Sequence, residues 1–202
     1  MKKISLALIL AASLFAQKPP KPLKPGIYAI FKTELGNIRV LLYEKDTPNS
    51  VAAFIGLAQG TQGWRDPKGN VVKKPMYDNT TFYRIIPGDV VQGGSPTGDT
   101  SYNCGFTIKD EILPGIRFQG GSLAIANAGT PDTGGCQFFF TTGPEHAFDG
   151  KFAIIGQTVE GEDVVRKLSQ VPVHDEHPAN PPKLISVTIE RVGPVPVVKN
   201  KK

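Results

Sequence analysis

One cation and three neutral amides interrupt apolar runs in this sequence of 202 residues. A guanidinium stays charged and is costly to bury, so an arginine among apolar residues needs a partner or a task. None of the four side chains is a nucleophile, and none titrates near neutral pH. Such a set suits binding of an uncharged polar group, such as a peptide carbonyl, beside an apolar ring. The four residues are Arg84, Gln92, Asn127 and Gln137.

The stretch around Arg84 predicts two short strands joined by a turn. Aromatic and β-branched residues alternate with polar ones from Thr81 to Ile86, which favours a strand. Pro87-Gly88 ends it, because proline lacks a donor and glycine permits positive φ. A second strand is expected from Asp89 to Gln92. Strict alternation would place Arg84 on the same face as Phe82.

Apolar periodicity along the rest of the chain predicts a mostly β protein with two helices and no internal repeat. One helix should begin at Thr47, a plausible cap followed by Pro48, and end at Gly60. Another should run from Gly161 to Leu168. Short strands with a helix near each end favour a closed antiparallel barrel, which leaves no exposed edge. The expected strands are 27–33, 37–43, 81–86, 89–92, 122–127, 137–142, 152–157 and 183–192.

The first residues have the pattern of a secretory signal peptide. Lys2-Lys3 precede an apolar run from Ile4 to Phe15, and Ala16 stands before Gln17. The run is too short to span a bilayer comfortably, although an uncleaved anchor is the alternative. We therefore expect a signal peptide at 1–16, a flexible proline- and lysine-rich linker at 17–26, one domain at 27–193 and a flexible basic tail at 194–202.

The formal net charge is +5 and the pI about 9.2. Cleavage of the leader would remove Lys2 and Lys3, and many of the other lysines lie near the two ends of the chain. Because no basic stripe is evident within the domain, we expect no nucleic-acid partner. No second segment is long and apolar enough to cross a bilayer, so we expect no stable membrane insertion after cleavage.

Four short motifs combine the polar residues with glycines and aromatics. They are Phe82-Tyr83-Arg84-Ile85-Ile86-Pro87-Gly88 with Gln92-Gly93-Gly94, Ala126-Asn127-Ala128-Gly129, Gly135-Cys136-Gln137-Phe138-Phe139, and Phe148-Asp149-Gly150-Lys151 with Gly156. In order and spacing they resemble the cyclophilin-type peptidyl-prolyl isomerases, over roughly residues 27 to 192. The resemblance implies a closed eight-stranded antiparallel barrel capped by two α-helices.

The resemblance also implies a role for each polar residue. Arg84 would be the central catalytic residue, Gln92 would orient it or the substrate carbonyl, and Asn127 would hold the residue before proline. Gln137 would line the floor, and strand alternation would put Phe139 on the same side, with Phe138 in the barrel core. The implied substrate-binding set is Val90, Ala126, Gln137, Phe139, Phe148 and Phe152.

Each of these residues also has a structural alternative. The phenylalanines at 138–140 could be plain core, Arg84 could form a surface ion pair, and Asn127 could cap a turn. Three positions depart from the family pattern. Asp89 stands where an aromatic is usual, Ala147 where the family has tryptophan, and Phe152 where it has histidine. Asp89 would thin the proline slot or place a charge at its rim.

Cys104 and Cys136 form an even pair in a chain expected to be exported. A possible disulfide between them would pin the glycine-rich loop beside the pocket, and two free thiols are the alternative. His174-Asp175-Glu176-His177 has the spacing of two metal ligands. With no third ligand placed, a solvated acidic loop is the better interpretation, and no metal site is expected.

The sequence therefore predicts an exported, monomeric isomerase, periplasmic or secreted, that accelerates rotation about X–Pro bonds in folding or secreted proteins. Its partners would be proline-containing polypeptides, and the reaction needs no cofactor. The alternative is a module or chaperone that binds proline-containing segments with little turnover. A carrier barrel for small molecules is disfavoured because the inward strand positions are filled by Phe, Ile and Leu.

Overall fold

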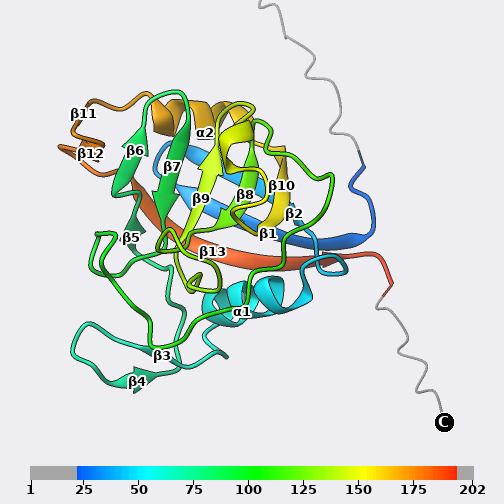
Figure 1. Cartoon of the computed structure of the whole chain (residues 1–202), viewed down its shortest axis with the longest axis horizontal. Coiled ribbons are helices and arrows are strands. Elements are labelled where there is room, and N and C mark those ends of the chain that lie inside the picture. The colour runs from blue at the N-terminus through cyan, green and yellow to red at the C-terminus, as the bar shows by residue number, and fades with distance from the viewer. Residues whose placement is uncertain (1–21, 195–202) are drawn as a thin grey trace, which may run out of the picture.

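The computed structural model describes residues 22–194 (Figure 1). The predicted signal peptide at 1–16 lies outside the described residues, as do positions 17–21 of the expected linker and 195–202 of the expected tail. No helix among the described residues has the length and apolar character that a membrane crossing requires.

A single nine-stranded antiparallel sheet forms the body of the domain (Figure 1). Its strand order is β5-β13-β1-β2-β10-β8-β9-β7-β6. The strands are β1 (Gly26–Thr33), β2 (Gly36–Leu42), β5 (Thr80–Thr81), β6 (Arg84–Ile86), β7 (Val90–Gly93), β8 (Ser122–Ile125), β9 (Phe138–Thr141), β10 (Ile154–Glu160) and β13 (Lys183–Val192). The predicted mostly β fold is confirmed, with strand limits that differ by up to three residues.

The count of eight strands and the uninterrupted strand at 81–86 were wrong. That segment is divided between β5 and β6, which lie at opposite ends of the sheet order and are joined only through Phe82 and Tyr83. The curled sheet therefore closes by this covalent link rather than by a continuous hydrogen-bonded ladder. Because the link breaks the alternation, Phe82 packs in the interior while Arg84 is half-buried on the outside.

Aromatic rings fill the interior of the curled sheet. Phe31 contacts Phe54, Phe138 and Phe140 with ring centroids 5.0 to 5.8 Å apart, and Phe138 meets Phe82 at 6.4 Å. All five rings are at most 1% exposed. Burial of apolar area on this scale is the main favourable term in folding, and these rings occupy interior space that a carried ligand would need.

Two helices cover the ends of the sheet (Figure 1). Helix α1 (Pro48–Gln59) packs against β13, and α2 (Glu162–Ser169) packs against β2, β6 and β7. Helix α1 ends at Gly60, which has φ 74°. A Cβ there would lie 2.5 Å from the backbone of Lys74, so the position requires glycine for space as well as for its conformation.

The start of α1 differs from the prediction. Thr47 occupies the cap position, but its hydroxyl donates to the carbonyl of Tyr43 instead of accepting from the helix. The free N–H groups of Asn49 and Ser50 donate to the carboxylate of Glu111, at 3.1 and 2.8 Å. A carboxylate from a distant loop thus supplies the cap, and it also complements the positive end of the helix dipole.

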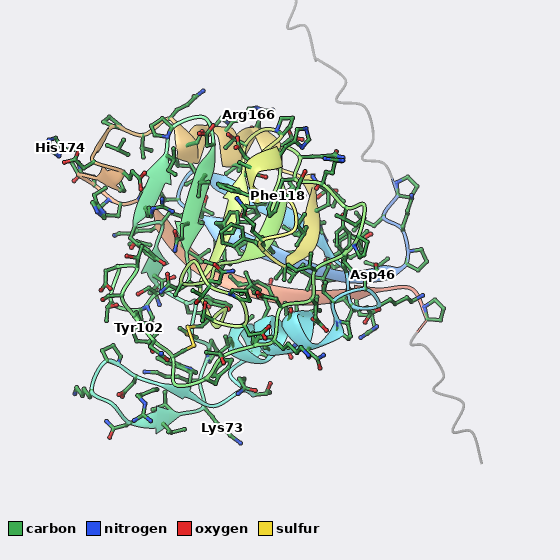
Figure 2. The ribbon with its side chains drawn as sticks, in the orientation of Figure 1. Asp46, Lys73, Tyr102, Phe118, Arg166 and His174 are labelled. Atoms are coloured by element: carbon green, nitrogen blue, oxygen red, sulfur yellow. A yellow bond between two sulfur atoms is a disulfide. The ribbon has the colours of Figure 1, made fainter. Side chains whose placement is uncertain are left out.

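Two hairpins lie outside the main sheet. One pairs β3 (Trp64–Arg65) with β4 (Val71–Val72), and the indole of Trp64 is buried and donates to the carbonyl of Lys74. The other pairs β11 (Val173–His174) with β12 (His177–Pro178) beside β6. His174 projects from this hairpin into solvent with 93% of its side chain exposed (Figure 2). No cluster of three metal-ligating side chains occurs within residues 22–194.

The Glu111 cap predicts a pH-dependent contribution to stability. Burial disfavours the charge, but hydrogen bonds from Ser50 and Asn49 outweigh it, so the pKa of Glu111 is lowered. The ionised Glu111 therefore stabilises the fold at any pH above the pKa that this carboxyl has in the unfolded chain. This stabilisation is lost as the pH falls through the lower pKa of Glu111 in the folded protein. We expect Glu111→Gln to cost about 0.5–1 kcal/mol of stability at pH 7.

Thermal or urea unfolding at pH 7 and at strongly acidic pH measures this difference. The difference in unfolding free energy between the wild type and Glu111→Gln should shrink toward zero in acid, where the glutamic acid and the glutamine are both neutral. Glu34→Gln, a change at an exposed carboxylate, is the control and should have little effect at either pH. An equal loss of stability for Glu111→Gln at both pH values would contradict the assignment of a charged cap.

Candidate active site

Strand register places Arg84, Gln92 and Phe139 in one row on the outer face of the sheet. Arg84 of β6 is directly opposite Gln92 of β7, which is opposite Phe139 of β9. Phe138 points inward instead, as predicted from strand alternation. Opposed residues on one sheet face have Cβ atoms about 4.5–5.5 Å apart, so this row forces a cation, an amide and an aromatic ring into contact range.

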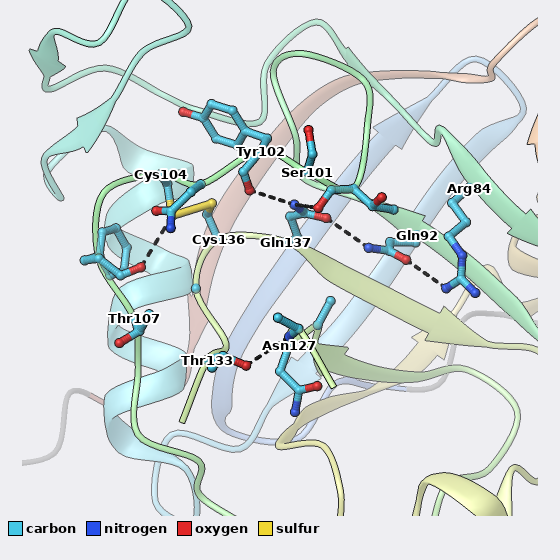
Figure 3. Close-up of a pocket in the computed structure, with 16 residues that line it drawn as sticks. Arg84, Gln92, Ser101, Tyr102, Cys104, Thr107, Asn127, Thr133, Cys136 and Gln137 are labelled. Atoms are coloured by element: carbon cyan, nitrogen blue, oxygen red, sulfur yellow. Dashed lines mark hydrogen bonds between the residues drawn. A yellow bond between two sulfur atoms is a disulfide. The ribbon is translucent and has the colours of Figure 1, made fainter. Parts of the chain in front are cut away.

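A chain of directed hydrogen bonds connects the polar side chains (Figure 3). The Nη1 of Arg84 donates to Oε1 of Gln92 at 3.1 Å, and the Nε2 of Gln92 donates to Oε1 of Gln137 at 2.9 Å. The Nε2 of Gln137 then donates to the carbonyls of Thr100 and Tyr102, at 3.1 and 2.9 Å. Gln92 is 7% exposed and Gln137 9%, so each amide has its partners where water is scarce.

These residues line a cleft of about 490 Å³. The structure brings Arg84, Gln92, Ala126, Asn127 and Gln137 together on it, as Figure 3 shows for the labelled side chains. The lining of the cleft also includes residues 100–104 and Phe106, Thr107 and Thr133. The cleft surface is therefore largely uncharged, apart from one half-buried guanidinium with 31% of its side chain exposed.

Asn127 uses its side chain to shape its own loop. Its Nδ2 donates to the carbonyl of Lys151 at 3.0 Å, and its Oδ1 accepts from the N–H of Gly129 at 3.1 Å. The next residue, Ala128, donates its N–H to Thr133 Oγ1. The turn-capping role of the side chain is therefore confirmed, and the predicted contact of Asn127 with substrate stays a prediction.

The disulfide pair borders the same cleft. The Sγ atoms of Cys104 and Cys136 are bonded, with the Cα atoms 6.2 Å apart (Figure 3). Cys136 is adjacent to Gln137, and Cys104 lies two residues after Tyr102, whose carbonyl accepts from Gln137. The bridge thus ties the 100–104 loop to the segment that carries Gln137, just before β9.

The predicted apolar residues form a cluster outside the cleft. Val90, Phe139, Phe148 and Phe152 pack together with Phe118 and Ile154, and none of the first four lines the cleft of Arg84. The ring of Phe139 meets Phe148 edge-on at 5.9 Å and Phe152 at 5.2 Å. Only 4% of Phe139 is exposed, whereas Phe148 and Phe152 are half-buried. The two outer rings therefore supply most of the accessible aromatic surface of this cluster.

Asp89 places negative charge beside this cluster, in the turn before Val90. Burial first, and then the neighbouring Asp89 carboxylate, raises the pKa of Glu145. The Asp89 carbonyl accepts from the N–H of Thr142 at 2.9 Å, which fixes the turn against the end of β9. At position 89, where the family usually has an aromatic residue, this chain therefore has an aspartate that forms an acidic pair with Glu145.

Two residues that hydrogen-bond to Gln137 or Arg84 were not identified from the sequence. Tyr83 is 2% exposed, and its hydroxyl donates to Oε1 of Gln137. Burial raises the pKa of the Tyr83 phenol far above its usual range, so it stays protonated. Glu176 accepts from Nε of Arg84 at 2.7 Å. Position within the Phe82-Tyr83-Arg84 motif could have indicated Tyr83, whereas no local pattern connects Glu176 to a residue 92 positions away.

Known proteins share this fold and these motifs. Residues 28–192 match the family model for cyclophilin type peptidyl-prolyl cis-trans isomerase/CLD. The chain is 36% identical over 168 residues to peptidyl-prolyl cis-trans isomerase B of Streptomyces anulatus, which covers 82% of this chain and 95% of that one. It is 35% identical over 166 residues to peptidyl-prolyl cis-trans isomerase A of Mycobacterium tuberculosis, with 80% and 91% covered.

A solved structure agrees with the sequence relatives. A Cryptosporidium parvum cyclophilin type peptidyl-prolyl cis-trans isomerase, crystallised in the presence of the dipeptide Ala-Pro, aligns with a TM-score of 0.68 and 26% identity. The alignment covers 82% of this chain and 99% of that one. The chain therefore belongs to the cyclophilin-type peptidyl-prolyl cis-trans isomerases. It is an enzyme of that class, acting on proline-containing polypeptides.

The disulfide bond between Cys104 and Cys136 gives a prediction about stability. It closes a loop with a sequence separation of 32 residues, so its loss should cost about 2–4 kcal/mol of stability. Unfolding of the oxidised chain and of Cys104→Ser/Cys136→Ser, by urea, measures this cost. Mass mapping without reductant should recover the two cysteine peptides joined. Two free thiols in the purified oxidised protein would reject the bridge.

Proposed function

We propose that Arg84 accelerates prolyl isomerisation by binding the twisted amide more tightly than either planar form. Rotation about an X–Pro bond has a barrier of about 18–20 kcal/mol because the amide loses its resonance at the top. The nitrogen, whose lone pair is then released, becomes an acceptor that it is not in either planar form, and a fixed cationic fork can donate toward it while also bonding the carbonyl oxygen. Differential binding of that form is sufficient for catalysis, without a covalent intermediate or a proton transfer.

The observation that carries this proposal is the guanidinium held at the edge of a neutral cleft. Gln92 accepts from Nη1 of Arg84 and Glu176 accepts from Nε, which leaves the other N–H groups of the fork for a substrate. Gln137 holds Gln92 in turn and forms the floor. The backbone at Ala126 and Asn127 binds the residue before proline, and the Asn127 side chain holds that backbone in place through its bonds to Lys151 and Gly129.

The proline ring binds over the neighbouring aromatic cluster in this proposal. Phe139 lies in the strand row next to Gln92, and Phe148 and Phe152 present partly exposed rings beside it. Val90, 3% exposed, supports the cluster from β7. An apolar surface next to a polar fork matches the two halves of a prolyl residue, a hydrocarbon ring and an amide.

A second candidate is a module that binds proline-containing segments with little turnover. The near-complete cover over Phe139 and the acidic pair of Asp89 and Glu145 favour it, because they reduce the apolar surface available to a proline ring. The two candidates differ in one observable. Both bind proline peptides, but only the isomerase accelerates exchange between their cis and trans forms.

Exchange of a short X–Pro peptide, followed by a cis/trans-selective protease or by NMR, distinguishes them. We expect clear acceleration by the wild-type chain and a loss of about 10²–10³ in kcat/KM for Arg84→Ala. Arg84→Lys should recover little, because an ammonium lacks the planar fork.

The matched control is Arg166→Ala. Arg166 is also a half-exposed arginine paired with a glutamate, Glu162, but it lies on α2 away from the cleft. Its variant should keep wild-type activity. An active wild type that Arg84→Ala leaves unchanged would contradict the mechanism. A wild type that binds the peptide without accelerating exchange would support the binding module.

We further propose that the enzyme is exported and acts as a monomer on folding or secreted proteins, in the periplasm or outside the cell. The leader pattern at residues 1–16 and the disulfide in the domain support export. The released chain would then have no membrane attachment and no nucleic-acid partner.

Expression of the full chain in a bacterium with an intact export pathway tests this localisation. The mature protein should appear outside the cytoplasm with a new N-terminus near Gln17, and deletion of residues 2–16 should retain it in the cytoplasm. Full-length protein that stays with the cytoplasmic membrane would support the uncleaved anchor instead.

A further inference from the structure

The β11–β12 hairpin covers the outer edge of β6, the strand that begins with Arg84 (Figure 1). The N–H of Ile85 donates to the carbonyl of Glu176 at 2.7 Å, and Nδ1 of His177 lies 3.4 Å from the carbonyl of Tyr83. β6 is the last strand in the sheet order, so these contacts occupy backbone groups that would otherwise be an open edge.

The same residue that binds the edge also holds the guanidinium. The Oε2 of Glu176 accepts from Nε of Arg84 at 2.7 Å, opposite the side on which Gln92 accepts from Nη1. Two bonds at different nitrogens fix the plane of the fork as well as its position. An arginine held by one bond alone retains rotation about its last torsions and loses more entropy when it binds a substrate.

The backbone conformation of the hairpin disfavours a glutamate at position 176. Asp175 has φ 48° and Glu176 has φ 66°, so both turn residues are left-handed, as in a two-residue hairpin that favours Asn-Gly. Four non-glycine residues in the described part of the chain have positive φ; three are Asn or Asp, and Glu176 is the fourth. A strained conformation held by a long acidic side chain points to a role for that side chain.

We propose that Glu176 is a positioning residue of the isomerase, which holds the Arg84 fork in the plane that the twisted amide requires. The inference rests on the proposed function of Arg84. It assigns a task to an acidic loop residue that has 45% of its side chain exposed and would otherwise be classed as solvated surface. A partly exposed ion pair adds little stability, so its expected effect is on catalysis rather than on folding.

Adjacent substitutions in one turn test this role. Glu176→Gly and Asp175→Gly relieve the same left-handed backbone, so both should fold at least as stably as the wild type. Only Glu176→Gly removes the partner of Arg84, since Asp175 contacts His174 and its side chain is 87% exposed. Glu176→Gln keeps the acceptor and the size but removes the charge.

We expect Glu176→Gly to lower kcat by about fivefold with little change in KM, because the lost contact matters most in the transition state. Asp175→Gly should match the wild type and Glu176→Gln should fall between them. In ¹H–¹⁵N spectra, the Nε–H signal of Arg84, assigned through its loss in Arg84→Ala, should shift and exchange faster with water in Glu176→Gly alone. The signal reports loss of the contact itself, and a purely structural role would leave kcat at the Asp175→Gly value although the signal shifts.

The outcomes separate this inference from the proposed function. If Arg84→Ala is impaired while Glu176→Gly is as active as Asp175→Gly, the role of Glu176 is overturned and that of Arg84 stands. If Arg84→Ala is as active as the wild type, both are overturned. If Glu176→Gly fails to fold, Glu176→Gln carries the test through kcat and the Arg84 Nε–H signal, and wild-type values for both would overturn the inference.

Discussion

A permanent positive charge held at the edge of an apolar barrel wall is the constraint on which the rest of this structure depends. A guanidinium keeps its charge in proteins, and the interior beside Arg84 is packed with phenylalanine rings. The chain resolves this by turning Arg84 outward and giving it Gln92 on one side and Glu176 on the other. The guanidinium is thus held in place while it stays partly exposed, as the proposed contact with a substrate requires.

The neutral amides extend this constraint into the cleft. Gln92 and Gln137 accept at one end and donate at the other, so the orientation of Arg84 is coupled to the carbonyls of the 100–102 segment. The disulfide between Cys104 and Cys136 closes the same loop against the barrel. Because Gln92 and Gln137 are neutral and Arg84 is a guanidinium, these three residues suit the binding of a distorted amide that we propose better than they suit proton transfer.

The main features of the fold could be predicted from local sequence signals. Alternating runs gave the strands, glycine and proline marked their ends, and Pro48 with Gly60 delimited the first helix. The ordered motifs around Arg84, Asn127, Gln137 and Phe148 identified the family and hence the barrel. Such signals are readable because each depends on neighbours in the chain, where propensity and periodicity act directly.

What only the tertiary structure decided depends on residues far apart in sequence. The break at Phe82-Tyr83 follows from closure of the sheet and overrides the alternation that placed Phe82 beside Arg84. Glu111 caps α1 from a loop more than sixty residues away, and Glu176 reaches Arg84 across 92. The cover over Phe139 is likewise set by rings from other segments. The sequence by itself determined the family and indicated the residues to which we assign the chemistry; long-range packing, which leaves no local pattern, decided what holds those residues in place.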